Sequence, residues 1–125
     1  MKNLQDPLAL RIASIMGFLC ILIGAFGAHA LKLEQPQLDW FEKANRYHMF
    51  TTGLMLFLAL YKQRSIMYLN LFGFIVFSGG LYAMALGAPR FLGAIVPFGG
   101  LAMMLSYILL FIKAWQAKDG NELKE

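Results

Sequence analysis

The chain has 125 residues, of which 59% are hydrophobic and 14% are charged. A water-soluble domain carries about 25% charged residues, so this composition leaves too little polar surface for a soluble globule. In a soluble protein the formal charge of +4 would suggest a nucleic-acid partner, but here the basic residues flank apolar segments. We therefore predict contact with anionic lipid headgroups and no nucleic-acid partner.

Four runs without a charged residue follow one another along the chain, at 12–31, 47–61, 65–89 and 91–112. An α-helix rises about 1.5 Å per residue and roughly 20 apolar residues cross the hydrocarbon core, so three runs are long enough to span a bilayer unaided. We predict an all-α integral membrane four-helix bundle. It forms a single domain with spans over about 8–31, 40–61, 65–88 and 91–115.

The first predicted helix begins at Asp6-Pro7, where aspartate suits the N-cap and proline the first helical position. Cys20, the only cysteine, lies in the middle of this span, and we interpret it as a small apolar packing residue. The charged start, apolar run and A-H-A sequence at 28–30 also resemble a secretory signal. The length of the run disfavours that alternative.

The second charge-free run, 47–61, is too short to span a bilayer by itself, at roughly 22 Å. Apolar and aromatic residues recur at helical spacing just before it, among them Trp40, Phe41 and Ala44. We therefore expect this helix to begin near Asp39 and to enter the membrane from an amphipathic first turn. Trp40 is interpreted as an anchor at the membrane interface.

The third and fourth spans are bounded by two short turns, 62–64 and 89–90. Pro97 lies inside the fourth run. Because proline lacks a backbone N–H, we expect it to kink this helix or to mark a late start.

The basic residues predict the orientation. Seven of the eleven lie on the side that holds both termini and the 62–64 turn, and four lie on the other side: Lys32, Lys43, Arg46 and Arg90. By the positive-inside rule we predict a multi-pass cell-membrane protein with cytoplasmic termini.

Small residues predict close helix packing in the half of the bundle away from the termini. Membrane helices associate by close backbone approach, because the hydrophobic effect does not act between them. We predict packing contacts at Gly24, Gly27, Gly53, Gly79, Gly80, Ala83, Gly87, Gly99 and Gly100. The alternative reading of these glycines is a narrow slot for a lipid tail or a quinone.

A polar cluster is predicted where the first and second helices meet the far side of the membrane: His29, Glu42, Arg46, Tyr47 and His48. We expect the two histidines to lie on the same side at comparable depth. They could ligate haem or a metal, relay protons, or hydrogen-bond to backbone or to Glu42 at the interface. Two imidazoles alone lack the further ligands of a metal site, so we predict no metal and no cofactor.

None of the four runs contains Asp, Glu, Lys or Arg, and no catalytic triad, phosphate loop or H-E-x-x-H motif occurs. We therefore predict a non-enzymatic structural or accessory protein that binds membrane lipid, a membrane-protein partner or a second copy of itself. The first alternative is a channel or carrier for a neutral or weakly polar solute. Its lining would consist of Asn70, Ser78, Tyr82 and Ser106. A bis-histidine haem or redox protein is a minor alternative.

Four segments carry a family resemblance: GAFGAHAL (24–31), FEKANRYHMF (41–50), FSGGLYAMAL (77–86) and PFGG (97–100). In this order they resemble the small membrane-protein family called domain of unknown function 423, or transmembrane protein 256. The resemblance implies a four-span protein of the bacterial inner membrane or of an organellar membrane, and no established activity. Thr51 stands where members often carry a second histidine, so the resemblance does not extend to a histidine site at that position.

Overall fold

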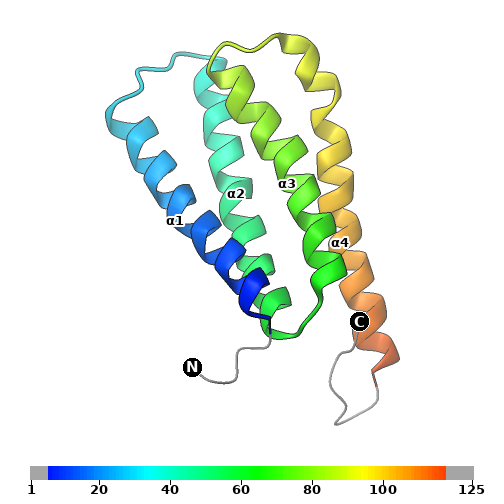
Figure 1. Ribbon diagram of the computed structural model, residues 1–125. Coiled ribbons are helices and arrows are strands. Elements are labelled where there is room, and N and C mark those ends of the chain that lie inside the picture. The colour runs from blue at the N-terminus through cyan, green and yellow to red at the C-terminus, as the bar shows by residue number, and fades with distance from the viewer. Residues whose placement is uncertain (1–5, 118–125) are drawn as a thin grey trace.

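The computed structural model describes residues 6–117 and folds them into four α-helices. These are α1 (Pro7–His29), α2 (Gln37–Leu60), α3 (Arg64–Ala85) and α4 (Val96–Gln116), with a short 3₁₀ helix, η1 (Arg90–Ala94), before α4. The helices run alternately in opposite directions, so α1 begins and α4 ends at the same end of the molecule (Figure 1). We call this the terminal end and the other the loop end. The all-α, four-helix prediction is confirmed.

The helices lie side by side in chain order and do not close into a square (Figure 1). α2 packs between α1 and α3, and α3 packs between α2 and α4, whereas the described parts of α1 and α4 touch at most marginally. α2 accordingly contributes nine buried residues, against four from α1. It is one of the two inner helices, with α3, although its sequence is the least apolar of the four.

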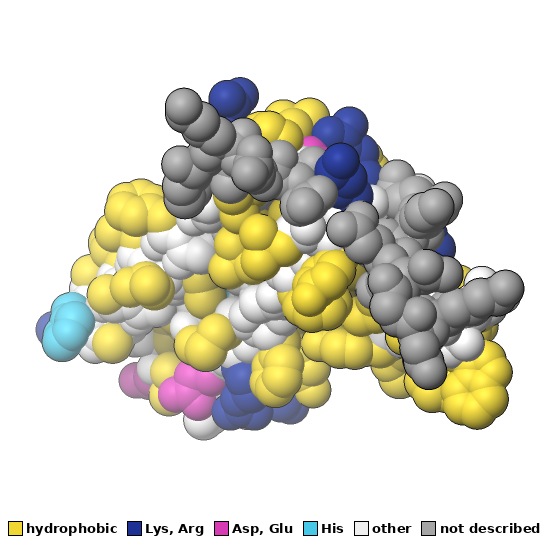
Figure 2. Space-filling model, turned by 90° about the horizontal axis from the view of Figure 1, so that it is seen from below, with side chains coloured by type: hydrophobic (Ala, Val, Ile, Leu, Met, Phe, Trp, Pro, Cys, Tyr) yellow, Lys and Arg dark blue, Asp and Glu magenta, His cyan; other side chains and the backbone are white. Residues whose placement is uncertain are grey.

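Three segments are long and apolar enough to cross a membrane: Pro7–His29, Arg64–Ala85 and Arg90–Gln116. Large hydrophobic side chains are exposed along them, including Phe18 at 62% and Phe98 at 65%. Seen from the terminal end, such side chains lie along the sides of the molecule (Figure 2). A lipid environment removes the cost that water would impose on so much exposed apolar surface.

The predicted start of α1 is confirmed, since the Asp6 side chain accepts a hydrogen bond from the Ala9 backbone N–H at 3.2 Å. The same carboxylate accepts two hydrogen bonds from Arg64, from Nε at 2.9 Å and from Nη2 at 2.6 Å. The Arg64 guanidinium holds the pKa of Asp6 below its usual value, and the Ala9 N–H adds to this while burial opposes it. The pair fastens the starts of α1 and α3 together at the terminal end.

At the loop end, η1 precedes α4, and α4 begins at Val96 with Pro97 in its first turn. The late-start expectation is confirmed, because proline is tolerated where the N–H has no helical partner. Arg90 in η1 lies 5.5 Å from the centre of the Trp40 ring, which joins this segment to the start of α2.

Two pairs of helices approach closely at glycines, as predicted. A Cβ on Gly24 would lie 2.8 Å from the Asn45 side-chain oxygen, and one on Gly27 would overlap the Phe41 ring. The tightest backbone contact joins α3 to α4. A Cβ on Gly99 would lie 2.7 Å from the carbonyl oxygen of Gly73, a glycine that the sequence prediction did not include.

Gly80 and Gly100 also lie where α3 meets α4. A Cβ on Gly80 would lie 2.9 Å from Val96, and one on Gly100 would touch the Phe77 ring at 3.5 Å. Gly53 and Gly79 were predicted wrongly, because a Cβ there would meet nothing within 4 Å.

Gly87 was also predicted wrongly as a packing residue, since it ends α3. Its φ of +108° lies in the left-handed region, where glycine has no Cβ clash. The Ala88 N–H donates to the Ala83 carbonyl at 2.9 Å and the Gly87 N–H to the Met84 carbonyl at 3.1 Å, which is a Schellman motif. Ala83 was predicted to pack, and in the structure its carbonyl accepts one of the two hydrogen bonds that end α3.

Candidate functional site

A partly buried polar cluster joins α1, α2 and α3. Asn45 Nδ2 donates to the Cys20 carbonyl on α1 at 3.0 Å and to the Tyr82 hydroxyl oxygen on α3 at 3.0 Å. Nδ1 of His48 lies 3.0 Å from the same hydroxyl oxygen. Asn45 and His48 are three residues apart on one face of α2, so both reach the line where the three helices meet. We call Cys20, Asn45, His48 and Tyr82 the polar knot.

His48 and Tyr82 share one hydrogen bond between Nδ1 and the hydroxyl oxygen, and the His48 tautomer decides which of the two groups donates. Nε2 is buried and makes no hydrogen bond to a described residue. The Met16 backbone carbonyl faces the ring without reaching hydrogen-bond geometry.

The surroundings of the knot are apolar. The His48 ring packs against Phe74 at 4.6 Å between centroids, and the Tyr82 ring meets Phe41 edge-on at 5.5 Å. One hydrophobic cluster, built on Met55 and Met67, lies toward the terminal end, and a second lies toward the loop end. The groups of the knot are hydrogen-bonded to one another across three helices, which suits them to fix the register of these helices.

A groove lies on the other side of α3, between α2 and α4. It encloses about 580 Å³ and is lined by residues of three helices: Tyr47, Phe50, Thr51, Asn70, Phe77, Gly100, Met103, Met104 and Tyr107. It exists because α4 packs on α3 and only marginally on α2, so the surface between them is left uncovered.

The floor of the groove is polar. Thr51 and Asn70 are each 1% exposed. Asn70 Nδ2 donates to the Thr51 backbone carbonyl at 3.3 Å, while the Thr51 hydroxyl has no hydrogen-bond partner in the described structure. The walls, by contrast, are aromatic and methionine side chains.

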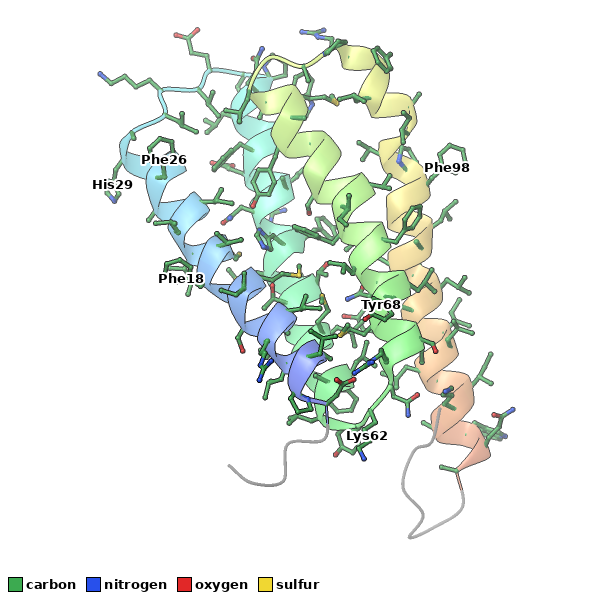
Figure 3. The ribbon with its side chains drawn as sticks, in the orientation of Figure 1. Phe18, Phe26, His29, Lys62, Tyr68 and Phe98 are labelled. Atoms are coloured by element: carbon green, nitrogen blue, oxygen red, sulfur yellow. The ribbon has the colours of Figure 1, made fainter. Side chains whose placement is uncertain are left out.

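The predicted cluster of His29, Glu42, Arg46, Tyr47 and His48 is not brought together. Its members are distributed as follows: His29, Glu42 and Arg46 are exposed, Tyr47 is 40% exposed at the groove, and His48 is 2% exposed in the knot. Figure 3 shows His29 at the end of α1, pointing away from the other helices.

The expectation that the two histidines lie at comparable depth is wrong. Gly17 faces Thr52 and Gly24 faces Asn45, so the antiparallel register sets His48 level with Cys20. His29 is nine residues further along α1, roughly 13 Å at helical rise.

The residues proposed as a channel lining are occupied by hydrogen bonds. Ser78 Oγ donates to the Ala44 carbonyl at 2.9 Å and Ser106 Oγ to the Ala102 carbonyl at 3.0 Å, and both side chains are fully buried. Tyr82 belongs to the knot and Asn70 to the groove floor. Ser78, Tyr82 and Asn70 on α3 therefore bond to groups on α2, whereas the Ser106 hydroxyl bonds within α4.

Sequence reasoning missed Asn45 and the groove. Phe41, Asn45, His48 and Thr52 recur at helical spacing, which would have identified a buried polar face had the neighbouring charges not suggested a solvated one. Within residues 6–117 no group of three or more His, Cys, Asp or Glu side chains is placed to hold a metal ion.

Comparison with known proteins gives the family. The family described as "Protein of unknown function (DUF423)" matches residues 23–100. A UPF0382 membrane protein of Haemophilus influenzae is 33% identical over 118 residues, covering 88% of this chain and 95% of the relative. A UPF0382 membrane protein of Staphylococcus haemolyticus is 35% identical over 119 residues, covering 86% and 98%.

The UPF0382 inner membrane protein YgdD of Escherichia coli K12 is 33% identical over 119 residues, covering 87% of this chain and 90% of the relative. No solved structure matches the chain. The matched segment contains all of α2 and α3, and with them Asn45, His48, Thr51 and Tyr82. The chain belongs to the DUF423 family of membrane proteins.

Proposed function

We propose that the chain is a non-enzymatic protein of the inner membrane that holds one lipid molecule in the groove between α2 and α4. The observation that carries this proposal is the groove itself, a concave surface of about 580 Å³ on the membrane-facing side of α3. Small-molecule sites of proteins have volumes of about 300–1,000 Å³ and mostly apolar walls.

The position of the groove favours a lipid tail over a headgroup. Thr51 lies 14 residues after the start of α2 and nine before its end, roughly 21 Å and 13 Å along the helix. Placing a charged headgroup at this depth would cost several kcal/mol of free energy, whereas a hydrocarbon chain is already in its usual environment there. Met103 and Met104 on α4 have flexible side chains that adapt to an irregular apolar ligand.

All four helices cross the membrane in this proposal. α1 and α3 begin at the terminal end, where Asp6 and Arg64 join them. If both cross in the same direction, α2 must return between them, and its 24 residues reach about 36 Å. Its first turn, in which Trp40 lies beside Arg90, is then in the headgroup layer.

The proposed orientation puts the termini and the α2–α3 turn in the cytoplasm, because seven of the eleven basic residues lie on that side. The structure offers less support for the two alternative functions. The hydroxyls of the proposed channel lining are used in hydrogen bonds to backbone carbonyls, between α3 and α2 for Ser78 and within α4 for Ser106. The two histidines of a haem site are at different depths.

Native mass spectrometry after extraction in a mild detergent tests the lipid proposal. Wild type should retain one lipid per chain. Gly100→Leu should lose it, because Gly100 lines the groove and a leucine side chain would fill it. Gly53→Leu is the matched control, since the space around Gly53 is open and it does not line the groove.

Three results would contradict the proposal. They are a wild-type protein without lipid, a Gly100→Leu variant that retains lipid as wild type does, and a groove closed by a second copy or another membrane protein. In the third case Gly100→Leu would release that protein, and the chain would be an accessory subunit.

A further inference from the structure

The Thr51 hydroxyl is a hydrogen-bond donor without a partner at the floor of the groove. Thr51 is 1% exposed, and its Oγ1 makes no hydrogen bond in the described structure. The nearby amide of Asn70 is bonded to the Thr51 backbone carbonyl, so it does not serve the hydroxyl. A buried hydroxyl is rarely left unpaired, because water would otherwise have satisfied it.

A hydrocarbon chain cannot satisfy this hydroxyl, since it contains no acceptor. Ester carbonyls of phospholipids lie near the headgroups, whereas Thr51 is close to the middle of α2. The ligand that uses the hydroxyl is therefore an uncharged lipid with a carbonyl oxygen that reaches the middle of the bilayer.

The walls of the groove suit a flat ring. Tyr47 and Phe77 meet edge-on at 4.8 Å between centroids, and Phe50 and Tyr107 complete an aromatic lining. Aromatic side chains attract another ring through offset stacking and edge contacts.

We propose that the groove binds the ring of a prenyl-chained quinone. The Thr51 hydroxyl is buried beneath the groove lining in the structure, and rotation of this side chain about χ1 lets it donate a hydrogen bond to one ring carbonyl. This inference rests on the proposed lipid-binding function and names the lipid class. It concerns binding alone, and involves no electron transfer. The prenyl chain continues along the α2–α4 surface into the bilayer.

Binding of two probes to the full chain in lipid nanodiscs tests the inference. One probe is a decyl-chained benzoquinone, and the other has the same chain on a benzene ring without carbonyls. Wild type should bind the quinone more tightly. Thr51→Val keeps the shape and removes the hydroxyl, so quinone affinity should fall about fivefold, as expected for one hydrogen bond. Affinity for the benzene probe should not change.

Thr52→Val is the matched control. The Thr52 hydroxyl donates to the His48 carbonyl at 2.9 Å and does not line the groove. This variant should bind both probes as wild type does. Thr51→Ser retains a hydroxyl and should restore most of the quinone affinity.

Thermal unfolding without ligand gives a second test that distinguishes the role of the Thr51 hydroxyl from that of the Thr52 hydroxyl. Thr51→Val should be as stable as wild type or more so, because the lost hydroxyl was unpaired, whereas Thr52→Val should unfold earlier. Equal quinone affinity of wild type and Thr51→Val, or equal affinity of wild type for both probes, would overturn the quinone inference and leave lipid binding intact. Binding of neither probe, together with no retained lipid in native mass spectrometry, would overturn both proposals.

Discussion

Oη of Tyr82 on α3 lies 3.0 Å from Nδ1 of His48 on α2, in the middle of an otherwise apolar interface. The contact fastens the two helices at one register, because a shift by one residue would leave both groups without partners. Asn45 donates to the same oxygen and extends the connection to α1.

Tyr82→Phe should lower the free energy of unfolding by about 1–2 kcal/mol, because the buried His48 imidazole and the half-buried Asn45 amide lose their shared partner. Tyr68→Phe is the control, since Tyr68 is 44% exposed on α3 (Figure 3) and its change should have little effect. Unfolding by SDS titration in mixed micelles measures both. Equal stability of the two variants would show that the knot does not hold the helices.

Gly99→Ala should separate α3 from α4. The added Cβ would lie 2.5 Å from the Phe77 backbone nitrogen and 2.7 Å from the Gly73 carbonyl oxygen, and backbone atoms cannot move aside as a flexible side chain would. We expect a loss of about 1–3 kcal/mol in the same SDS titration. Gly79→Ala meets open space and should remain within about 0.5 kcal/mol of wild type. A larger loss of stability in Gly79→Ala than in Gly99→Ala would contradict the close contact between α3 and α4 at Gly73 and Gly99.

The Asp6–Arg64 pair should make stability depend on pH in acid. Its hydrogen bonds with Arg64 hold the pKa of Asp6 below the usual value of 3.8, so the folded state favours the ionised carboxylate. The stabilisation is fully present above about pH 4 and is lost as the pH falls through the lowered pKa.

Asp6→Asn keeps an N-cap side chain but removes the charge. This variant should be less stable at pH 7 and should lose less stability than wild type between pH 4 and pH 2. Circular dichroism melts across that range make the comparison. If the stability of the two proteins changed with pH in parallel, the Asp6–Arg64 pair would not be the cause of the pH dependence.

Cysteine labelling tests whether α2 crosses the membrane. Lys32→Cys and Lys62→Cys place exposed thiols beyond the two ends of α2, in a Cys20→Ala background. A membrane-impermeant maleimide should label position 32 in right-side-out vesicles and position 62 in inverted ones. A mirrored pattern would reverse the proposed orientation, whereas labelling of both positions from one side would exclude the crossing.

The sequence predicted the fold well because length and apolarity determine how a chain meets a bilayer. The Asp6 cap and the late start of α4 at Pro97 are local effects and were predictable for that reason. Gly53 and Gly79 were assigned to packing because composition does not tell which face of a helix meets a neighbour.

The site could be predicted only in part. His48 and Tyr82 were noted as polar groups in or beside spans, but their contact depends on the α2–α3 register, which no local pattern specifies. Asn45 stands among charged residues and looked solvated. The groove results from α4 leaving α2 uncovered, a tertiary relationship without a signature in the residues that line it.

Cross-linking with a photoactivatable, diazirine-bearing quinone in native membranes, followed by peptide mapping, tests lipid binding in the groove most directly. The account predicts adducts concentrated on groove residues such as Phe50, Met103 and Met104, and lost from the Gly100→Leu variant. Adducts spread evenly over other exposed surfaces, such as Phe72 and Ile75 on the far side of α3, would show that the groove is ordinary lipid-facing surface and would contradict the account.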